Sequence, residues 1–109
     1  MKTPYQIVAE HYAANRDYYL AKAKRSNLKK RLFRRDLLRQ LKSVPCMDCG
    51  VAYPTHVMEF DHVRGVKRFN LAASPWLNAE GILAEASKCE IVCANCHRER
   101  TMRRLQGRP

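Results

Sequence analysis

Four cysteines stand in two pairs whose spacing is typical of metal-binding turns. Cys46 and Cys49 form the first pair, and Cys93 and Cys96 form the second, with residues 50–92 between the pairs. A turn with two intervening residues directs both thiolates at one point, and two such turns supply the four ligands of a closed tetrahedral zinc site. The pattern therefore predicts a structural zinc. Because such a site has no open coordination position, we expect it to stabilise the fold and not to catalyse a reaction.

Two other interpretations of the cysteines are weaker. The chain has five cysteines, an odd number, and nothing in the sequence indicates secretion, which disfavours a disulfide framework. The four paired thiolates are also suitable ligands for an iron–sulfur cluster, although the usual spacing for such a cluster is tighter. The fifth cysteine, Cys89, begins the apolar run over residues 89–92, and we expect it to be a buried small hydrophobic residue.

Asp61, His62 and His97 form a second set of residues that could do chemistry. Asp61 and His62 end a short apolar run, and His97 directly follows the second cysteine pair. The zinc would link the turn before that run to the helix after it, so we expect the three side chains to lie near one another. A hard divalent cation takes carboxylate and imidazole ligands, and a neutral histidine accepts a proton from water near neutral pH. These residue types are the ones that metal-assisted phosphodiester hydrolysis requires.

The elements that must position these residues predict an α+β protein. No glycine or proline interrupts residues 5–41, and apolar residues at helical spacing there predict an N-terminal helical arm with a break at Asn15 or at Ser26 and Asn27. A turn at Arg64 and Gly65 follows the apolar run. The further predicted elements are a strand over 57–63, a helix over 79–86, a strand-like run over 89–92 and a helix that starts at the second cysteine pair.

The charge distribution indicates a polyanionic partner. The chain has 21 Lys and Arg against 10 Asp and Glu, a formal net charge of +11. The excess lies in residues 1–45 and 98–109, whereas residues 46–97 are slightly acidic. We expect these arms to bind a nucleic-acid backbone, because neutralised phosphates release counterions, and we rank a lipid surface lower. The residues expected to contact DNA are Lys29, Lys30, Arg31, Arg34, Arg35, Arg98 and Arg100.

The sequence also bears on location. No apolar run is long enough to cross a membrane, and residues 1–20 lack the pattern of an export signal. We therefore expect no membrane partner and a cytoplasmic location, in a bacterial or phage-infected cell.

Residues 46–101 resemble the HNH endonuclease family, the ββα-metal or His-Me finger nucleases, in its four-cysteine zinc variety from phages and mobile elements. The resemblance implies a DNA endonuclease or nickase that uses one divalent ion, Mg²⁺ or Mn²⁺. It also implies that Asp61 and His97 bind this ion and that His62 is the general base. The motifs that carry the resemblance are Cys46-x2-Cys49, Glu59-Phe60-Asp61-His62, Gly65, Cys93-x2-Cys96-His97 and Arg98-x-Arg100-Thr101.

The chain departs from the family at one position. The family's middle asparagine, which orients the base histidine through a backbone contact, usually lies four or five residues before the third cysteine. Lys88 stands in that neighbourhood here. Asn70, Asn78 and Asn95 are the candidates to replace it, and we include Asn95 in the predicted catalytic set.

The sequence thus predicts a basic helical DNA-binding arm over residues 1–44 and an HNH nuclease domain over 45–109, with a small ββα-metal core and paired zinc knuckles. The expected partner is double-stranded DNA, without a small-molecule cofactor, and a homodimer or a larger phage or mobile-element complex is compatible with this function. The alternative is a non-catalytic zinc-ribbon module that binds nucleic acid, and a third class is an RNA-processing or structural zinc protein. A module that only binds nucleic acid does not require Asp61 and His62 to converge with His97. These residues therefore discriminate between a nuclease and a non-catalytic protein.

Overall fold

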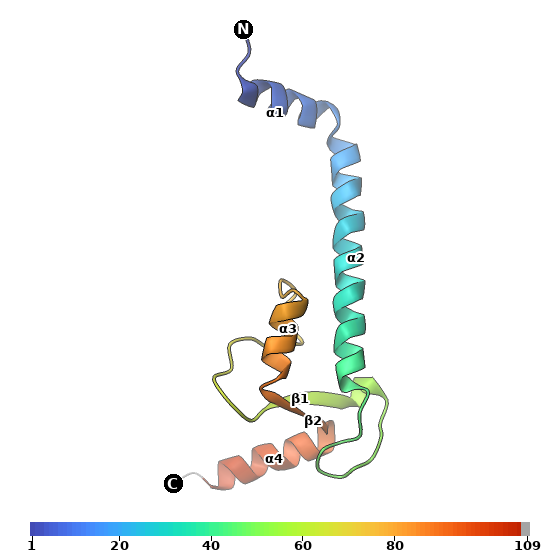
Figure 1. Ribbon diagram of the computed structural model, residues 1–109, viewed down its shortest axis with the longest axis vertical. Helices are drawn as coiled ribbons and strands as arrows, with labels where there is room; N and C mark the ends of the chain where they lie inside the picture. The colour runs from blue at the N-terminus through green and yellow to red at the C-terminus, as the bar shows by residue number, and fades with distance from the viewer. Residues whose placement is uncertain (108–109) are drawn as a thin grey trace. The chain divides into compact units, whose positions relative to one another are not determined.

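The structure is a computed structural model that describes residues 1–107. The chain divides into two compact units, one over Met1–Phe33 and one that begins at Arg34. Helix α1 (Pro4–Ala14) lies in the first unit, and helix α2 (Arg16–Lys42) contributes to both units (Figure 1). The prediction of a helical N-terminal arm is confirmed, and of the two alternative positions for its break the structure has the one at Asn15.

The two ends of α1 follow from local hydrogen bonding. Thr3 caps the start: its hydroxyl accepts from the backbone N–H of Gln6, and the Gln6 side chain accepts from the backbone N–H of Thr3. Pro4 suits the first helical position because it has no N–H to leave unpaired. At the other end the Asn15 side chain donates to the carbonyl of His11, which competes with the helical pattern and separates α1 from α2.

The second unit is built on a two-stranded antiparallel sheet. Strand β1 (Met58–His62) follows a short 3-10 turn η1 (Thr55–Val57), and strand β2 (Cys89–Cys93) pairs with it in the register Met58 to Cys93 and His62 to Cys89. Helix α3 (Ala79–Ala86) lies between the strands in sequence, and helix α4 (Ala94–Gln106) begins directly after β2. The α+β class and each of the expected strands and helices of this region are confirmed.

Successive residues of β1 point to opposite faces of the sheet. Met58, Phe60 and His62 share one face, whereas Glu59 and Asp61 share the other face, where they contact side chains of α4. The neighbours Asp61 and His62 are therefore held by different parts of the fold.

Two small apolar clusters form the core of the second unit. Cys46, Met58, Val92 and Cys93 make the first cluster, which joins the first cysteine pair to both strands. The second cluster contains Leu71, Ile82 and Cys89, which confirms the prediction that Cys89 is buried. Leu37, Leu38 and Leu41 of α2 pack against this second cluster.

This packing explains where the second unit begins. The end of α2 belongs to the second unit because its leucines cover the second cluster, so the structural division lies at Arg34. The predicted functional division into residues 1–44 and 45–109 falls after α2 has ended. It remains a prediction about function.

Glycines permit the two sharp turns that flank β1. Gly50 has a φ of 72° directly after the first cysteine pair, and Gly65 has a φ of 68° after the strand. Residues with a Cβ rarely adopt this left-handed conformation, so glycine is required at both turns. The turn at Gly65 was expected from the sequence. Within residues 1–107 no helix is long and apolar enough to cross a membrane.

The core can be tested on α3, where a buried and an exposed side chain are neighbours. Ile82 is 1% exposed and Leu83 is 49% exposed. We expect Ile82→Ala to lower the free energy of unfolding by about 2 to 5 kcal/mol, because it leaves a cavity in the second cluster. Leu83→Ala, measured beside it by urea unfolding of the zinc-loaded chain, should cost under about 1 kcal/mol. Equal losses would contradict the described packing of α3.

Candidate metal centre and active site

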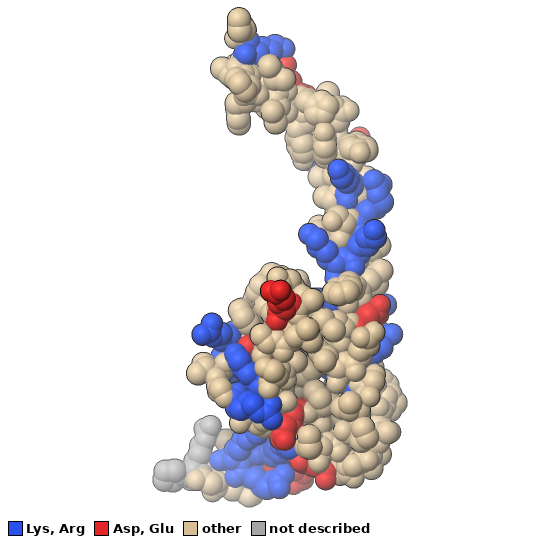
Figure 2. Space-filling view, viewed as in Figure 1, with Lys and Arg blue, Asp and Glu red and all other residues tan. Residues whose placement is uncertain are grey.

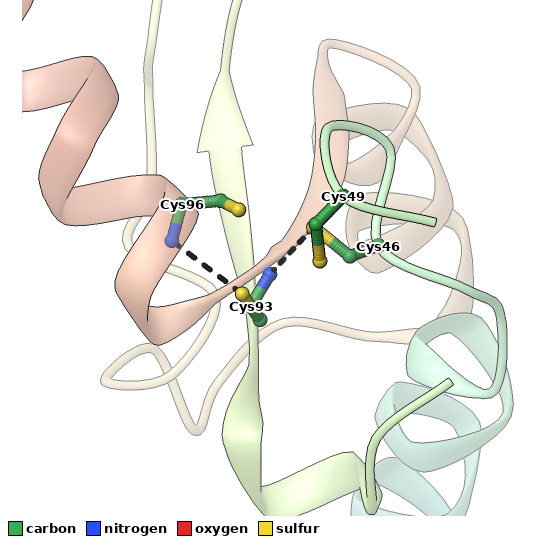
Figure 3. A group of neighbouring side chains, drawn as sticks. All are labelled: Cys46, Cys49, Cys93 and Cys96. Carbon is green, nitrogen blue, oxygen red and sulfur yellow. Dashed lines mark hydrogen bonds between the residues drawn. The ribbon is translucent and has the colours of Figure 1, made fainter. Parts of the chain in front are cut away.

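The four paired cysteines converge on one point. Their sulfur atoms all lie within 4.8 Å of one another, and they come from a loop, the end of β2 and the first turn of α4 (Figure 3). In a zinc tetrathiolate with bonds of about 2.3 Å the sulfurs are about 3.8 Å apart, so a small contraction brings this set onto one ion. The cluster is thus compatible with the predicted structural zinc.

Backbone hydrogen bonds hold the first cysteine pair against the sheet. The N–H of Gly50 donates to the carbonyl of Cys46 at 2.9 Å and closes the turn. The N–H of Met47 donates to the carbonyl of Ile91 at 3.0 Å, which fastens the turn to β2. Since Cys93 ends this same strand, the two cysteine pairs are brought together by the sheet itself.

Backbone N–H groups also point at the sulfurs. The N–H of Cys93 lies 3.3 Å from the Cys46 sulfur, and the N–H of Cys96 lies 3.4 Å from the Cys93 sulfur (Figure 3). Although burial raises the pKa of Cys46, the backbone N–H groups of Cys49 and Cys93 hold that pKa below its usual range. The pKa of Cys96 is raised by the hydrogen bond to Cys93 and by burial. Four thiolates this close repel one another, and a cation removes that repulsion.

The structural role of the cluster can be tested with a matched pair of cysteines. We expect Cys46→Ser to lose zinc and to unfold the second unit, because its sulfur belongs to the cluster. Cys89→Ser replaces a buried cysteine outside the cluster and should keep one zinc per chain. Metal analysis and circular dichroism measure both effects. A folded Cys46→Ser chain that retains its zinc would disprove the assignment.

Asp61 is buried at the centre of a charged network. It is 3% exposed and stands opposite Glu90 in the sheet, a pairing of like charges that destabilises the strands unless a cation offsets it. Nη1 of Arg100 donates to Asp61 at 2.8 Å and to Glu90 at 2.9 Å. The other guanidinium nitrogens of Arg100 donate to Asp48, between the first two cysteines, at 2.6 and 2.7 Å. Arg100 thus joins the first cysteine turn to both strands.

Arg104 supplies a second cation to Asp61. Its two terminal nitrogens donate to the two carboxylate oxygens of Asp61 at 2.8 and 2.7 Å. Hydrogen bonds from Arg104 and then Arg100 lower the pKa of Asp61 to about 2, against the effect of burial. Arg100 was expected to contact DNA, but the structure places its guanidinium among three carboxylates, where every donor nitrogen is already bonded.

His97 lies beside Asp61, as the sequence predicted. Nε2 of His97 is 3.5 Å from a carboxylate oxygen of Asp61, and Nδ1 is 2.8 Å from a carboxylate oxygen of Glu59. Ligands at about 2.1 Å and at right angles are about 3 Å apart, so Asp61 and His97 fit as neighbouring ligands of one ion. Histidines that bind metals commonly donate their other ring N–H to a carboxylate, and Glu59 is placed to accept it.

His62 was expected to converge with Asp61 and His97, but the structure directs it to the opposite face of the sheet from Asp61, because neighbouring residues of a strand alternate, and it contacts a different carboxylate there. Its Nε2 is 2.9 Å from a carboxylate oxygen of Glu85 on α3. Glu85 is 2% exposed and also accepts from the Lys88 ammonium and from the backbone N–H groups of Arg68 and Phe69. These bonds, that of Lys88 first, lower the pKa of Glu85 to about 2. An ionised carboxylate only accepts, so neutral His62 carries its proton on Nε2 and keeps the lone pair on Nδ1.

The predicted orienting role of Asn95 has no support in the geometry. Asn95 is exposed in the first turn of α4, and among the hydrogen bonds within residues 1–107 none joins it to His62. Asn70 and Asn78 accept from backbone N–H groups of their own turns. Glu85 holds His62 instead. A sequence signal was present, because Glu85 follows Ile82 by three residues and so takes a place on the apolar face of α3.

One cavity brings the histidines together. It has a volume of about 270 Å³ and lies within the second unit. His62, His97 and Glu59 line it, and Lys42 and Lys67 add positive charge. The cavity is therefore a concave site lined by both histidines, with two lysines and one carboxylate around them.

The remaining residues predicted to contact DNA are distributed over two helices. Lys29, Lys30 and Arg31 are exposed on the part of α2 that belongs to the first unit, and Figure 2 shows basic side chains along this helix with few acidic ones among them. Arg98 is exposed on α4. Arg34 is half-buried and Arg35 is exposed in the second unit.

Comparisons with protein-family models, with curated proteins and with solved structures found no match to this chain.

The charged network around Asp61 yields a stability prediction. Arg100→Leu should lower the free energy of unfolding by about 3 kcal/mol, because it leaves Asp61 and its carboxylate neighbours without their shared cation. Arg103 is the control, since its side chain is 66% exposed and approaches Asp48 only at 3.9 Å. Arg103→Leu should change the same quantity by less than about 0.5 kcal/mol. Urea unfolding of both variants measures the difference, and similar values would mean that the network contributes little.

Proposed function

We propose that the chain is a metal-dependent endonuclease or nickase of the HNH type that cuts double-stranded DNA. The observation that carries the proposal is the pair His62 and His97 on one cavity, with Asp61 beside His97 and a separate four-cysteine cluster as scaffold. The order β1, β2 and α4 is what a ββα-metal core requires, with α3 inserted between the strands. The net charge of +11 favours a polyanionic substrate.

Asp61 and His97 are the residues that would hold the catalytic ion. When bound, a hard divalent ion neutralises charge on the scissile phosphate and stabilises the leaving oxygen. Glu59 holds the proton of His97 at Nδ1 and leaves Nε2 directed toward Asp61. Arg104 must release Asp61 for this, and its side chain is 49% exposed, so it can turn toward a phosphate of the substrate.

His62 is the proposed general base. The ionised Glu85 fixes the proton of His62 on Nε2, so Nδ1 accepts the proton of the attacking water. Glu85 also stabilises the imidazolium that forms once the proton has moved. Because Glu85 acts through His62 and touches no reacting atom, it is a positioning residue.

The test is nicking of supercoiled plasmid with Mg²⁺ or Mn²⁺. We expect His62→Ala to lower the rate about 10²- to 10⁴-fold through loss of the base. Glu85→Gln keeps the shape of the side chain and removes its charge, and should lower the single-turnover rate about 10- to 100-fold with little change in DNA affinity.

His11→Ala is the matched control, because His11 is exposed on α1 in the first unit and should leave the rate unchanged. Equal cutting by the wild type and His62→Ala would refute the catalytic assignment. The same conclusion follows if neither protein cuts while both bind DNA.

One observation favours a second candidate function, a non-catalytic zinc module that binds nucleic acid. Both oxygens of Asp61 accept hydrogen bonds from Arg104, and one also accepts from Arg100, which satisfies the carboxylate without an added ion. In that case Asp61 is structural, and binding without cleavage is expected with DNA or RNA. Comparing affinity and cleavage for duplex DNA and duplex RNA distinguishes the two functions.

A further inference from the structure

The end of α2 forms one wall of a second cavity. This cavity has a volume of about 330 Å³, and all of its lining residues belong to the second unit. The turn η1 and the loop at Ala72 complete the lining. Among residues 1–107 no carboxylate lines it, and its charged or polar lining residues are Arg34, Arg35, Arg39, Lys42, Thr55 and His56.

The cations of this wall are gathered by helical spacing. Residues four apart lie above one another on a helix, so Arg35 and Arg39 form one row and Arg34 and Lys42 lie on the next. Like charges at this spacing destabilise a helix, and a bound anion removes the penalty.

None of these four cations has a carboxylate partner among residues 1–107. The arginines of α4 differ, since Arg100 and Arg104 are both paired with Asp61. The cations at the end of α2 therefore keep a positive charge that no carboxylate of the described residues balances, unlike Arg100 and Arg104.

Arg34, which lines the cavity, has a side-chain donor that no described residue satisfies. Among residues 1–107 its Nη1 is the buried side-chain atom that has no hydrogen-bond partner. A buried charged donor without a partner is costly, and such groups are normally satisfied by an acceptor. An anion in the cavity would supply one.

The second cavity adjoins the candidate active site. Lys42 and Ala72 line both cavities. The Lys42 ammonium lies 5.4 Å from the ring centre of Phe60, the residue between Glu59 and Asp61 on β1. An anion bound against Arg34 and Arg39 is thus a neighbour of whatever occupies the cavity of His62 and His97.

We propose that this second cavity binds one phosphate of the DNA backbone, next to the phosphate that is cut. The position of this phosphate relative to the cleaved bond rests on the proposed nuclease function, whereas the phosphate site itself depends only on the cations of α2. The site would fix which phosphodiester bond reaches His62, because phosphate contacts set the register of a protein on its nucleic acid.

Two measurements on the full zinc-loaded chain test the proposal. The first is an NMR titration with inorganic phosphate that follows the Nε–H signals of the arginines. The second is the salt dependence of affinity for a labelled DNA duplex, measured in the His62→Ala background without added Mg²⁺. We expect the signals of Arg34 and Arg39 to shift and to saturate with added phosphate. We expect Arg34→Gln/Arg39→Gln to reduce the slope of log K against log salt by about 0.9, which corresponds to the loss of one phosphate contact.

Arg68→Gln/Arg103→Gln removes the same charge from two exposed positions of the second unit that line neither cavity and is the matched control. The proposal requires that the control keep the phosphate shifts of Arg34 and Arg39, while zinc content confirms that both variants fold. An unchanged slope in the α2 variant would overturn the proposal. Loss of the phosphate shifts of Arg34 and Arg39 in the control would also overturn it. A chain that fails to nick plasmid but shows the expected slope change refutes the nuclease function and leaves the phosphate site in place.

Discussion

The second unit depends on the convergence of four sulfur atoms. Its buried apolar side chains are few, and two of them, Cys46 and Cys93, are members of the cysteine cluster itself. So small a core leaves little hydrophobic free energy to balance the entropy of ordering the chain. A structural zinc contributes about 10 to 16 kcal/mol in comparable small domains, which is enough to decide whether such a unit folds. The cysteine cluster and the core are thus one structure.

Arg100 connects the cysteine cluster to the sheet through hydrogen bonds. It holds Asp48, which lies between the first two cysteines, and it also holds Asp61 and Glu90 on the paired strands. Disruption of the cysteine cluster would therefore disturb Asp61, although no hydrogen bond within residues 1–107 joins a cysteine to it. The alternation of β1 then sends Asp61 toward α4 and His62 toward α3, so that each of the histidines His62 and His97 meets its own carboxylate.

Two kinds of basic residue look alike in the sequence but differ in whether a carboxylate of the protein pairs with them. Arg100 and Arg104 are committed to carboxylates inside the second unit. The cations at the end of α2 line a cavity without a carboxylate and adjoin the cavity of the histidines. A positive charge that is already balanced contributes little to binding a polyanion, so the position of the acids, and not the count of arginines, decides which surface attracts one.

Spacing along the chain determined much of this protein. The cysteine pairs, the turn at Gly65 and the order of strands and helices were all predicted, and Asn15 was one of the two positions given for the break in the arm, because these features follow from local geometry. The proximity of Asp61 and His97 was also predicted, from the expected zinc. Only the tertiary structure showed that Glu85 holds His62, and that Arg100 serves the protein's own carboxylates. These contacts join residues far apart in the chain, and a sequence pattern does not record which side chains packing brings together.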